Sequence, residues 1–330
     1  MTTPFVAHTR AELHDEIAAR RTPGDRVGFV PTMGALHDGH ASLLRVAREQ
    51  VGDGPVVASI FVNPLQFGAG EDLDRYPRTL EADLKVCERE GVDIVFAPEV
   101  EEVYPGGVAT EASVTIEPGR LATVLEGAVR PGHFRGVLTV VAKLFGLVRP
   151  DLAVFGQKDY QQLVLIRRMV ADLCLGVEIV GAETEREPDG LALSSRNAYL
   201  DDEQRREATV LQRALRAAQG AATHGLPAAF DAARAEPRSS TGVDLDYLEI
   251  TTPDLGALPE VPPPGTEARI LIAARVGTTR LIDNLPLVIG QKSAREASPP
   301  NRERSEPGSA EPKDSAAKRL HAFPTSEASK

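Results

Sequence analysis

The feature that most constrains the fold is an alternation of short apolar runs with longer segments of helical spacing. In most of these longer segments, apolar residues recur every three or four positions, as in amphipathic helices. The alternation predicts an α/β fold with a mostly parallel sheet, in which ligands bind beyond the carboxyl ends of the strands. The predicted strands are Val27–Val30, Val56–Val62, Ile94–Ala97, Leu152–Phe155 and Val177–Val180.

The pattern changes after Asn197. Asp201 or Asp202 can cap a helix that carries an apolar stripe, and two strand-like runs, Asp246–Ile250 and Arg269–Ala274, flank a Pro-rich loop. We therefore expect a parallel-sheet domain over residues 1–187 and a smaller α+β domain over residues 188–290. Residues 291–330 contain few apolar side chains, so we expect a disordered tail.

Composition narrows the classes of partner. The formal net charge of -11 disfavours nucleic acids and anionic membranes, both of which require concentrated Lys and Arg. The first ten residues lack the pattern of a secretory signal, and the apolar stretch Gly136–Val148 is too short to cross a bilayer. Cys87 and Cys174 form neither a disulfide framework nor a zinc motif. These features predict a cytoplasmic protein that acts on small molecules, with Gly136–Val148 as a buried helix.

The most informative segment, Val30–His40, follows the first predicted strand and leads into a predicted helix, Ala41–Gln50. A helix N-terminus carries unpaired N–H groups and positive potential, so it suits phosphate. His37 and His40, in an HxGH pattern, could donate hydrogen bonds to phosphate oxygens during attack on the α-phosphorus. The alternative is that one histidine caps the turn and the other is only solvated.

Further segments also carry polar side chains near the expected ligand edge. Asn63 and Gln66 follow the second strand, although Asn-Pro is also a common turn. Lys158 and Gln162 follow Leu152–Phe155, although a surface ammonium and a helix-surface amide are the ordinary alternatives. Ser194 combined with Arg196 suits phosphate, or the segment is a helix cap. The turn Arg130–Val137 could contact a substrate or cap the apolar helix. The polar segments along the chain are PTMGALHDGH, FVNPLQFG, YPRT, RPGHFRGV, GQKDYQQL and DGLALSSRN.

These segments, in this order and with RLIDNL at residues 280–285, resemble the pantothenate synthetase family of the HxGH nucleotidyltransferase-like superfamily, from about Val27 to about Leu287. The resemblance implies a Rossmann-like sheet domain and an ATP-dependent acid–amine ligase of pantothenate and coenzyme A biosynthesis. Pantoate and ATP would form pantoyl-adenylate and pyrophosphate, and β-alanine would then release AMP and give pantothenate. It also implies a homodimer, with Mg²⁺ held mainly through the ATP phosphates rather than by a protein metal site.

The resemblance assigns roles residue by residue. His40 is the favoured catalytic histidine, with His37 as its partner on the phosphates and Lys158, Arg196 and Ser194 completing the catalytic set. Gln66 and Gln162 would bind pantoate, with Asn63 nearby. The base for the amine step stays open. The implied ATP-binding residues are Met33, Gly34, Ala35, Leu36, His37, Asp38, Gly39, His40, Gly156, Gln157, Lys158, Asp159, Glu185, Leu193, Ser194, Ser195 and Arg196.

The sequence departs from the family pattern in a few places. Leu65 and Leu193 stand where methionine is more usual, and Glu185 stands where the family usually has an apolar residue near the adenine.

Other functions are alternatives to the ligase that the resemblance implies. The competing functions are another HxGH nucleotidyltransferase, a class I aminoacyl-tRNA synthetase, which the acidic charge disfavours, and a catalytically silent nucleotide-binding protein.

Overall fold

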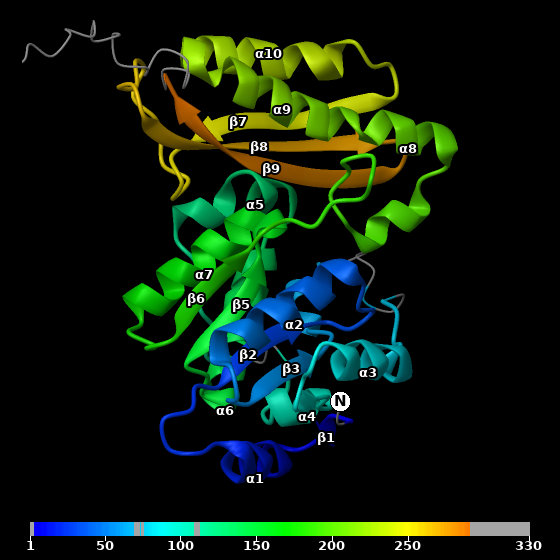
Figure 1. The fold of residues 1–330 in the computed structure, drawn as a ribbon, viewed down its shortest axis with the longest axis vertical. Helices are drawn as coiled ribbons and strands as arrows, with labels where there is room; N and C mark the ends of the chain where they lie inside the picture. The colour runs from blue at the N-terminus through cyan, green and yellow to red at the C-terminus, as the bar shows by residue number, and fades with distance from the viewer. Residues whose placement is uncertain (1–2, 69–72, 74–75, 109–112, 291–330) are drawn as a thin grey trace, which may run out of the picture. The chain divides into compact units, whose positions relative to one another are not determined.

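A computed structural model describes residues 3–68, 73, 76–108 and 113–290, which lie within one compact unit of the chain. The tail predicted to be disordered lies outside the described residues. A six-stranded parallel sheet has the order β1-β4-β3-β2-β5-β6 (Figure 1). Its strands are β1 (Phe5–Ala7), β2 (Gly28–Thr32), β3 (Val56–Ile60), β4 (Ile94–Phe96), β5 (Leu152–Gly156) and β6 (Glu178–Ala182).

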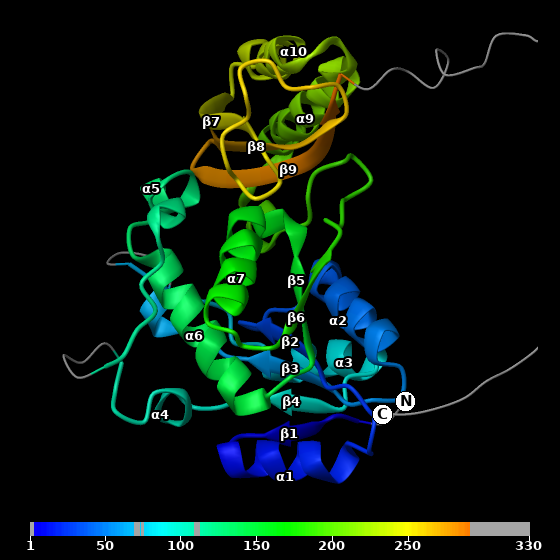
Figure 2. The ribbon, with the colours of Figure 1, turned by 90° about the vertical axis from the view of Figure 1, so that its left-hand side faces the viewer.

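Helices cover both faces of this sheet (Figure 2). Helices α1, α6 and α7 share one apolar cluster, and α2 and α3 pack in a second cluster with the opposite side chains of the strands. The short helices α4 and α5 and the 3-10 turns η1, η3 and η4 join these elements. Their bounds are α1 (Arg10–Arg20), α2 (Asp38–Val51), α3 (Leu80–Arg89), α4 (Val100–Val103), α5 (Glu126–Val129), α6 (His133–Val148), α7 (Tyr160–Asp172), η1 (Pro64–Gln66), η3 (Arg120–Thr123) and η4 (Gln157–Asp159).

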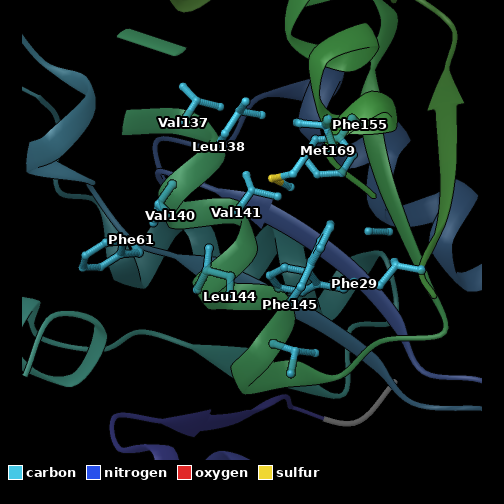
Figure 3. Packing of buried hydrophobic residues seen from close by; sticks show 14 of the residues in the cluster. Phe29, Phe61, Val137, Leu138, Val140, Val141, Leu144, Phe145, Phe155 and Met169 are labelled. Atoms are coloured by element: carbon cyan, nitrogen blue, oxygen red, sulfur yellow. The ribbon is translucent and has the colours of Figure 1, made fainter. Parts of the chain in front are cut away.

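The larger apolar cluster is centred on α6 (Figure 3). Phe145 of this helix meets the rings of Phe29 from β2 and Phe155 from β5 edge to face, with ring centroids 6.3 and 6.4 Å apart. The predicted buried helix is confirmed, and it begins three residues earlier than predicted because Gly132 takes a left-handed conformation and starts the turn. By packing against β2 and β5, helix α6 holds in place two of the strands whose carboxyl ends lead into the polar segments.

A second, antiparallel sheet has the order β7-β8-β9 and is covered by α9 and α10 (Figure 1). The predicted class, a parallel-sheet α/β fold with a smaller α+β part, is confirmed. Strand β9 was not predicted as a strand. The elements are α8 (Asp202–Ala208), capped by Asp201, α9 (Val210–Ala221), α10 (Leu226–Arg238), η5 (Ser195–Tyr199), η6 (Ala222–His224), β7 (Val243–Thr251), β8 (Thr266–Val276) and β9 (Thr279–Ile289).

No helix within the described part of the chain is both long enough and apolar enough to cross a membrane.

Candidate active site

The polar segments meet where the strand order reverses. Strand β2 is followed along the chain by β3 on one side of it, whereas β5, its other neighbour, is followed by β6 on the far side. Connections that leave in opposite directions open a crevice between the carboxyl ends of β2 and β5, which is the usual ligand position in such sheets. The segment Met33–His40 leaves β2 at this point, and Gly156–Asp159 leaves β5.

A buried carboxylate shapes the start of the first segment. Gly34 and Ala35 both have positive φ, at 83° and 51°. The Asp83 side chain, only 1% exposed, accepts hydrogen bonds from the backbone N–H of Ala35 (3.1 Å) and of Leu36 (2.8 Å). Because a carboxylate can accept several N–H donors, Asp83 holds this unusual turn from the neighbouring helix α3.

The two histidines cap helix α2, which begins at Asp38 rather than at the predicted Ala41. His37 Nδ1 accepts a hydrogen bond from the Gly39 N–H (3.1 Å), and His40 Nδ1 accepts one from the His37 N–H (3.4 Å). This reciprocal pair is a capping box in which both acceptors are imidazoles. Since each Nδ1 accepts, each neutral ring carries its proton on Nε2 and presents a donor there. The capping role therefore coexists with a capacity to donate to an anion.

The histidine environment keeps both rings neutral. Burial, followed by the positive charge of Lys158, lowers the pKa of His37, and burial and the neighbouring His37 lower the pKa of His40 to about 4. The ring centroids of the two histidines are 4.2 Å apart. Gly39 permits this arrangement, because a Cβ at that position would lie only 2.9 Å from His37 Cε1. Asp38, between them, is exposed, with Arg89 3.8 Å from its carboxylate.

Lys158 lies at the end of β5 in η4, and its side chain is 19% exposed. Its ammonium is 3.9 Å from the Asp159 carboxylate, and it lowers the pKa of that carboxyl group. The side chain of Gln157, in the same turn, binds only protein groups among the contacts found for it. Its Nε2 donates to the Gly181 carbonyl (2.9 Å) and its Oε1 accepts from Arg269 (2.9 Å), so this amide supports the turn.

The segment that contains Ser194 and Arg196 follows a hairpin closed by the bridge between Arg186 and Ala192. Ser194 caps η5 through a hydrogen bond from the Arg196 N–H (3.3 Å). A helix cap was the alternative that the sequence left open for this segment. The Arg196 side chain is exposed and forms no ion pair with any residue that the structure describes, so its donors can serve an anion. Ser195 is also exposed, whereas Leu193 is half-buried and lies opposite Gly39.

Glu185, the departure from the family pattern, is exposed, and its backbone carbonyl accepts from the Leu193 N–H (2.9 Å).

The predicted pantoate residues differ in exposure. Gln66 is half-buried and donates from Nε2 to the Met33 sulfur (3.0 Å), so it faces the histidine segment. Asn63 is 1% exposed, donates to Gln66 Oε1 (3.1 Å) and accepts from the Tyr104 hydroxyl (2.7 Å). The buried Asn63 thus holds the Gln66 side chain in its orientation. His133 also holds this region, because its Nδ1 lies 2.9 Å from the Gln66 carbonyl.

Two adjoining pockets contain several of the predicted residues. Lys158 and Asp159 line both, Ser194 and Arg196 line one, and Gln162 from the first turn of α7 lines the other. His37, His40 and Gln66 line neither, although Lys158 is close enough to affect both histidines. The pockets also contain residues that the sequence did not indicate as site residues: Glu126, Tyr247, Arg280, Ile282, Asp283 and Asn284.

Comparisons with known proteins find relatives over most of the chain. The family model described as pantoate-beta-alanine ligase matches residues 5–286. A pantothenate synthetase from Nocardioides sp. is 72% identical over 313 residues, which is 93% of each chain. A crystal structure of pantothenate synthetase from Thermus thermophilus has 51% identity and a TM-score of 0.76, covering 85% of this chain and 98% of that one.

A further crystal structure is that of a pantoate-beta-alanine ligase from Francisella tularensis complexed with beta-gamma ATP and beta-alanine. It shares 35% identity with this chain and has a TM-score of 0.68, covering 86% of this chain and 97% of that one. The family model spans most of the chain, and relatives well above 30% identity cover more than two thirds of it. The chain therefore belongs to the pantoate–β-alanine ligase family.

Proposed function

We propose that this protein forms pantothenate in two steps, through a pantoyl-adenylate made at the crevice between β2 and β5. Family membership gives the overall reaction: the chain is an ATP-dependent ligase that joins pantoate to β-alanine. The intermediate and the residue roles are the proposal. This reaction would place the protein in pantothenate and coenzyme A biosynthesis.

The observation that carries the proposal is the proximity of two Nε2–H imidazoles to Lys158 where the strand order reverses. Neutral donors at a helix N-terminus, beside the Lys158 ammonium, form a site for the triphosphate of a nucleotide. Arg196 and Ser194, which share a pocket with Lys158, add donors suited to phosphate oxygens.

In the first step a carboxylate oxygen of pantoate attacks the α-phosphorus of ATP. A new P–O bond forms, and the bond between the α-phosphorus and the bridging oxygen breaks, so pyrophosphate leaves with the electron pair. His37 and His40 donate to oxygens on which negative charge grows, while Lys158 and Arg196 offset the repulsion between two anions. Gln66 and Gln162 orient pantoate with neutral amides, and Asn63 holds Gln66 in place.

In the second step the amine of β-alanine attacks the carbonyl carbon of the adenylate. The C–N bond forms, the C–O bond to AMP breaks, and the amine nitrogen releases a proton. No residue is assigned as the acceptor of that proton. Positioning of the two reactants supplies much of the rate, because binding replaces a bimolecular encounter.

Magnesium would accompany ATP and neutralise phosphate charge when bound. Magnesium usually keeps several waters and takes one or two carboxylates together with substrate phosphates. The exposed Asp159 beside Lys158 fits such a partial ligand set. Among residues 3–68, 73, 76–108 and 113–290, no three His, Cys, Asp or Glu side chains cluster into a separate metal site.

The assembly and location of the protein are proposals from family resemblance. We propose a cytoplasmic homodimer whose chain divides near residue 188 into a nucleotide-binding and pantoate-binding part and a smaller part. The presence of two separate sheets supports this boundary. Sedimentation velocity tests the dimer, and limited proteolysis tests the boundary.

Exchange of labelled pyrophosphate into ATP tests the two-step route. With magnesium and pantoate present and β-alanine absent, label should enter ATP, and omission of pantoate should stop the exchange. Addition of β-alanine should then give equal amounts of pantothenate and AMP. Pantothenate formation without any exchange would contradict a reversible adenylate, and exchange driven only by a phosphorylated acceptor would favour another nucleotidyltransferase.

A further inference from the structure

The strand β9 contacts the turn that carries Lys158. Asn284 of this strand is 2% exposed, and its Nδ2 donates to the backbone carbonyls of Gln157 and Lys158, each at 2.9 Å. We propose that Asn284 is a positioning residue that fixes the backbone from which Lys158 reaches the nucleotide. This inference rests on the proposed role of Lys158 in binding ATP phosphates.

The orientation of the Asn284 amide follows from its other neighbour. Its Oδ1 accepts from Arg269 Nε (2.8 Å) and Nη2 (2.5 Å). A guanidinium has donors only, so the oxygen of the amide must face Arg269 and the NH₂ group must face the two carbonyls. Each hydrogen of this NH₂ group therefore has one acceptor, and the amide is fully used inside the protein.

Arg269 is itself rigidly held. It is 6% exposed, its guanidinium carbon lies 4.0 Å from the centroid of the Tyr160 ring, and its Nη2 also donates to Gln157 Oε1 (2.9 Å). The stacked and bonded guanidinium restricts the movement of Asn284. Gln157 and Lys158 of the η4 turn are thus tied to β8 and β9 through one network of buried side chains.

This network matters for Lys158 because a lysine side chain has a flexible four-carbon stem and little stiffness of its own. Only its backbone position and its packing limit where the ammonium lies. Misplacement of a reacting group by about 1 Å can cost about 100-fold in rate. The two carbonyl contacts from Asn284 therefore restrict the reach of the ammonium, although Asn284 itself need not touch the substrates.

The test is a double-mutant cycle between Asn284 and Lys158. Asn284→Asp keeps the acceptor for Arg269 but replaces the donor with an oxygen that repels two carbonyls. We expect pantoate-dependent pyrophosphate exchange to fall about 10-fold to 100-fold in kcat/KM for ATP. In a Lys158→Ala background, the same change should lower exchange less than about 2-fold, since the ammonium that Asn284 positions is already absent.

A purely structural role predicts the opposite pattern, in which the losses of the two single variants multiply. Full exchange activity in a folded Asn284→Asp variant, or multiplying losses, would overturn the proposal. Asn284→Ser, whose hydroxyl cannot reach both carbonyls, repeats the cycle if the aspartate variant does not fold. Ile289→Val removes one buried methylene from the same strand and should lower the Tm slightly while exchange stays unchanged.

Calorimetric binding of ATP with magnesium, in the absence of pantoate, separates this inference from the proposed function. If the wild-type protein shows no exchange, a reversible adenylate is contradicted, and the same cycle is then measured on the Kd for ATP. Weaker ATP binding in Asn284→Asp that disappears in the Lys158→Ala background supports the positioning role. Equal weakening in both backgrounds overturns it.

Discussion

At the residue scale, the two histidines combine a structural role with a chemical one. The Nδ1 atoms of His37 and His40 cap helix α2, which leaves an Nε2–H on each ring for an anion. A glutamine in place of His40 would keep the cap, because Gln is a usual third residue of a capping box. The same substitution would remove the imidazole donor, so it separates helix stability from catalysis.

His40→Gln should therefore fold normally and lose about 100-fold or more of pantoate-dependent pyrophosphate exchange at neutral pH. Circular dichroism checks the fold, and the exchange assay checks the activity. Full activity in the variant would exclude a catalytic role for His40. His14→Gln is a matched control, since His14 bonds the Leu147 carbonyl far from the β2–β5 crevice, and it should leave exchange unchanged.

The low pKa of His40 also predicts a change of stability with pH. Its pKa falls from 6.5 to about 4 in the folded protein, chiefly because the ring is buried. The unfolded chain then binds this proton first, so stability is lost as pH falls from 6.5 and the loss is complete below about 4. The wild type should lose about 3 kcal/mol more unfolding free energy than His40→Gln between pH 7 and pH 4. Urea unfolding at several pH values measures the difference, and parallel losses would contradict it.

At the scale of elements, helix α6 and the turn η1 are in direct backbone contact. A Cβ at Gly136 would lie 2.3 Å from the Leu65 carbonyl oxygen and 2.5 Å from Gln66 Cα. Asn63 Nδ2 also donates to the Gly136 carbonyl (3.2 Å). The backbone that carries Gln66 can therefore lie where it does only because residue 136 has no side chain.

Gly136→Ala should push η1 away from α6 and move Gln66. We expect a loss of about 1–3 kcal/mol in unfolding free energy and a rise in KM for pantoate that exceeds any rise in KM for ATP. Steady-state kinetics with each substrate varied in turn measures the split. Gly146→Ala is the control, because a Cβ there meets nothing within 4 Å and the same helix should tolerate it. Equal changes in both KM values would argue against a specific effect on Gln66.

The elements also show what the sequence could and could not predict. The five apolar runs became strands because continuous apolar sequence suits a sheet covered on both faces. Strand β1 is only three residues long, and β9 carries buried polar residues at Asp283 and Asn284, so neither has a clear apolar pattern. Asp83 and Asn284 act on residues 47 to 127 positions away, and local spacing contains no signal for such contacts.

At the scale of the whole molecule, β9 joins the second sheet to the lining of both pockets. Arg280 pairs with Glu126 of α5 at 2.7 and 2.8 Å, and Glu126 also accepts from the Tyr247 hydroxyl (2.8 Å). Asp283, further along β9, forms two hydrogen bonds with Arg186, at 2.7 and 2.9 Å. Together with Asn284, these contacts bind three separate segments of the site to one strand.

Glu126→Gln tests how much of this joining is electrostatic. The Glu126 and Arg280 side chains are each 15% exposed, so loss of the charge leaves a guanidinium poorly compensated, at a cost of about 2 kcal/mol in unfolding free energy. Asp246, the other partner of Arg280, has a side chain that is 32% exposed. Asp246→Asn should therefore lower the unfolding free energy by less than about 1 kcal/mol. Urea unfolding at low and high salt compares the two variants. Equal costs would mean that burial does not distinguish the pairs, and β9 would then be held to α5 mainly by packing.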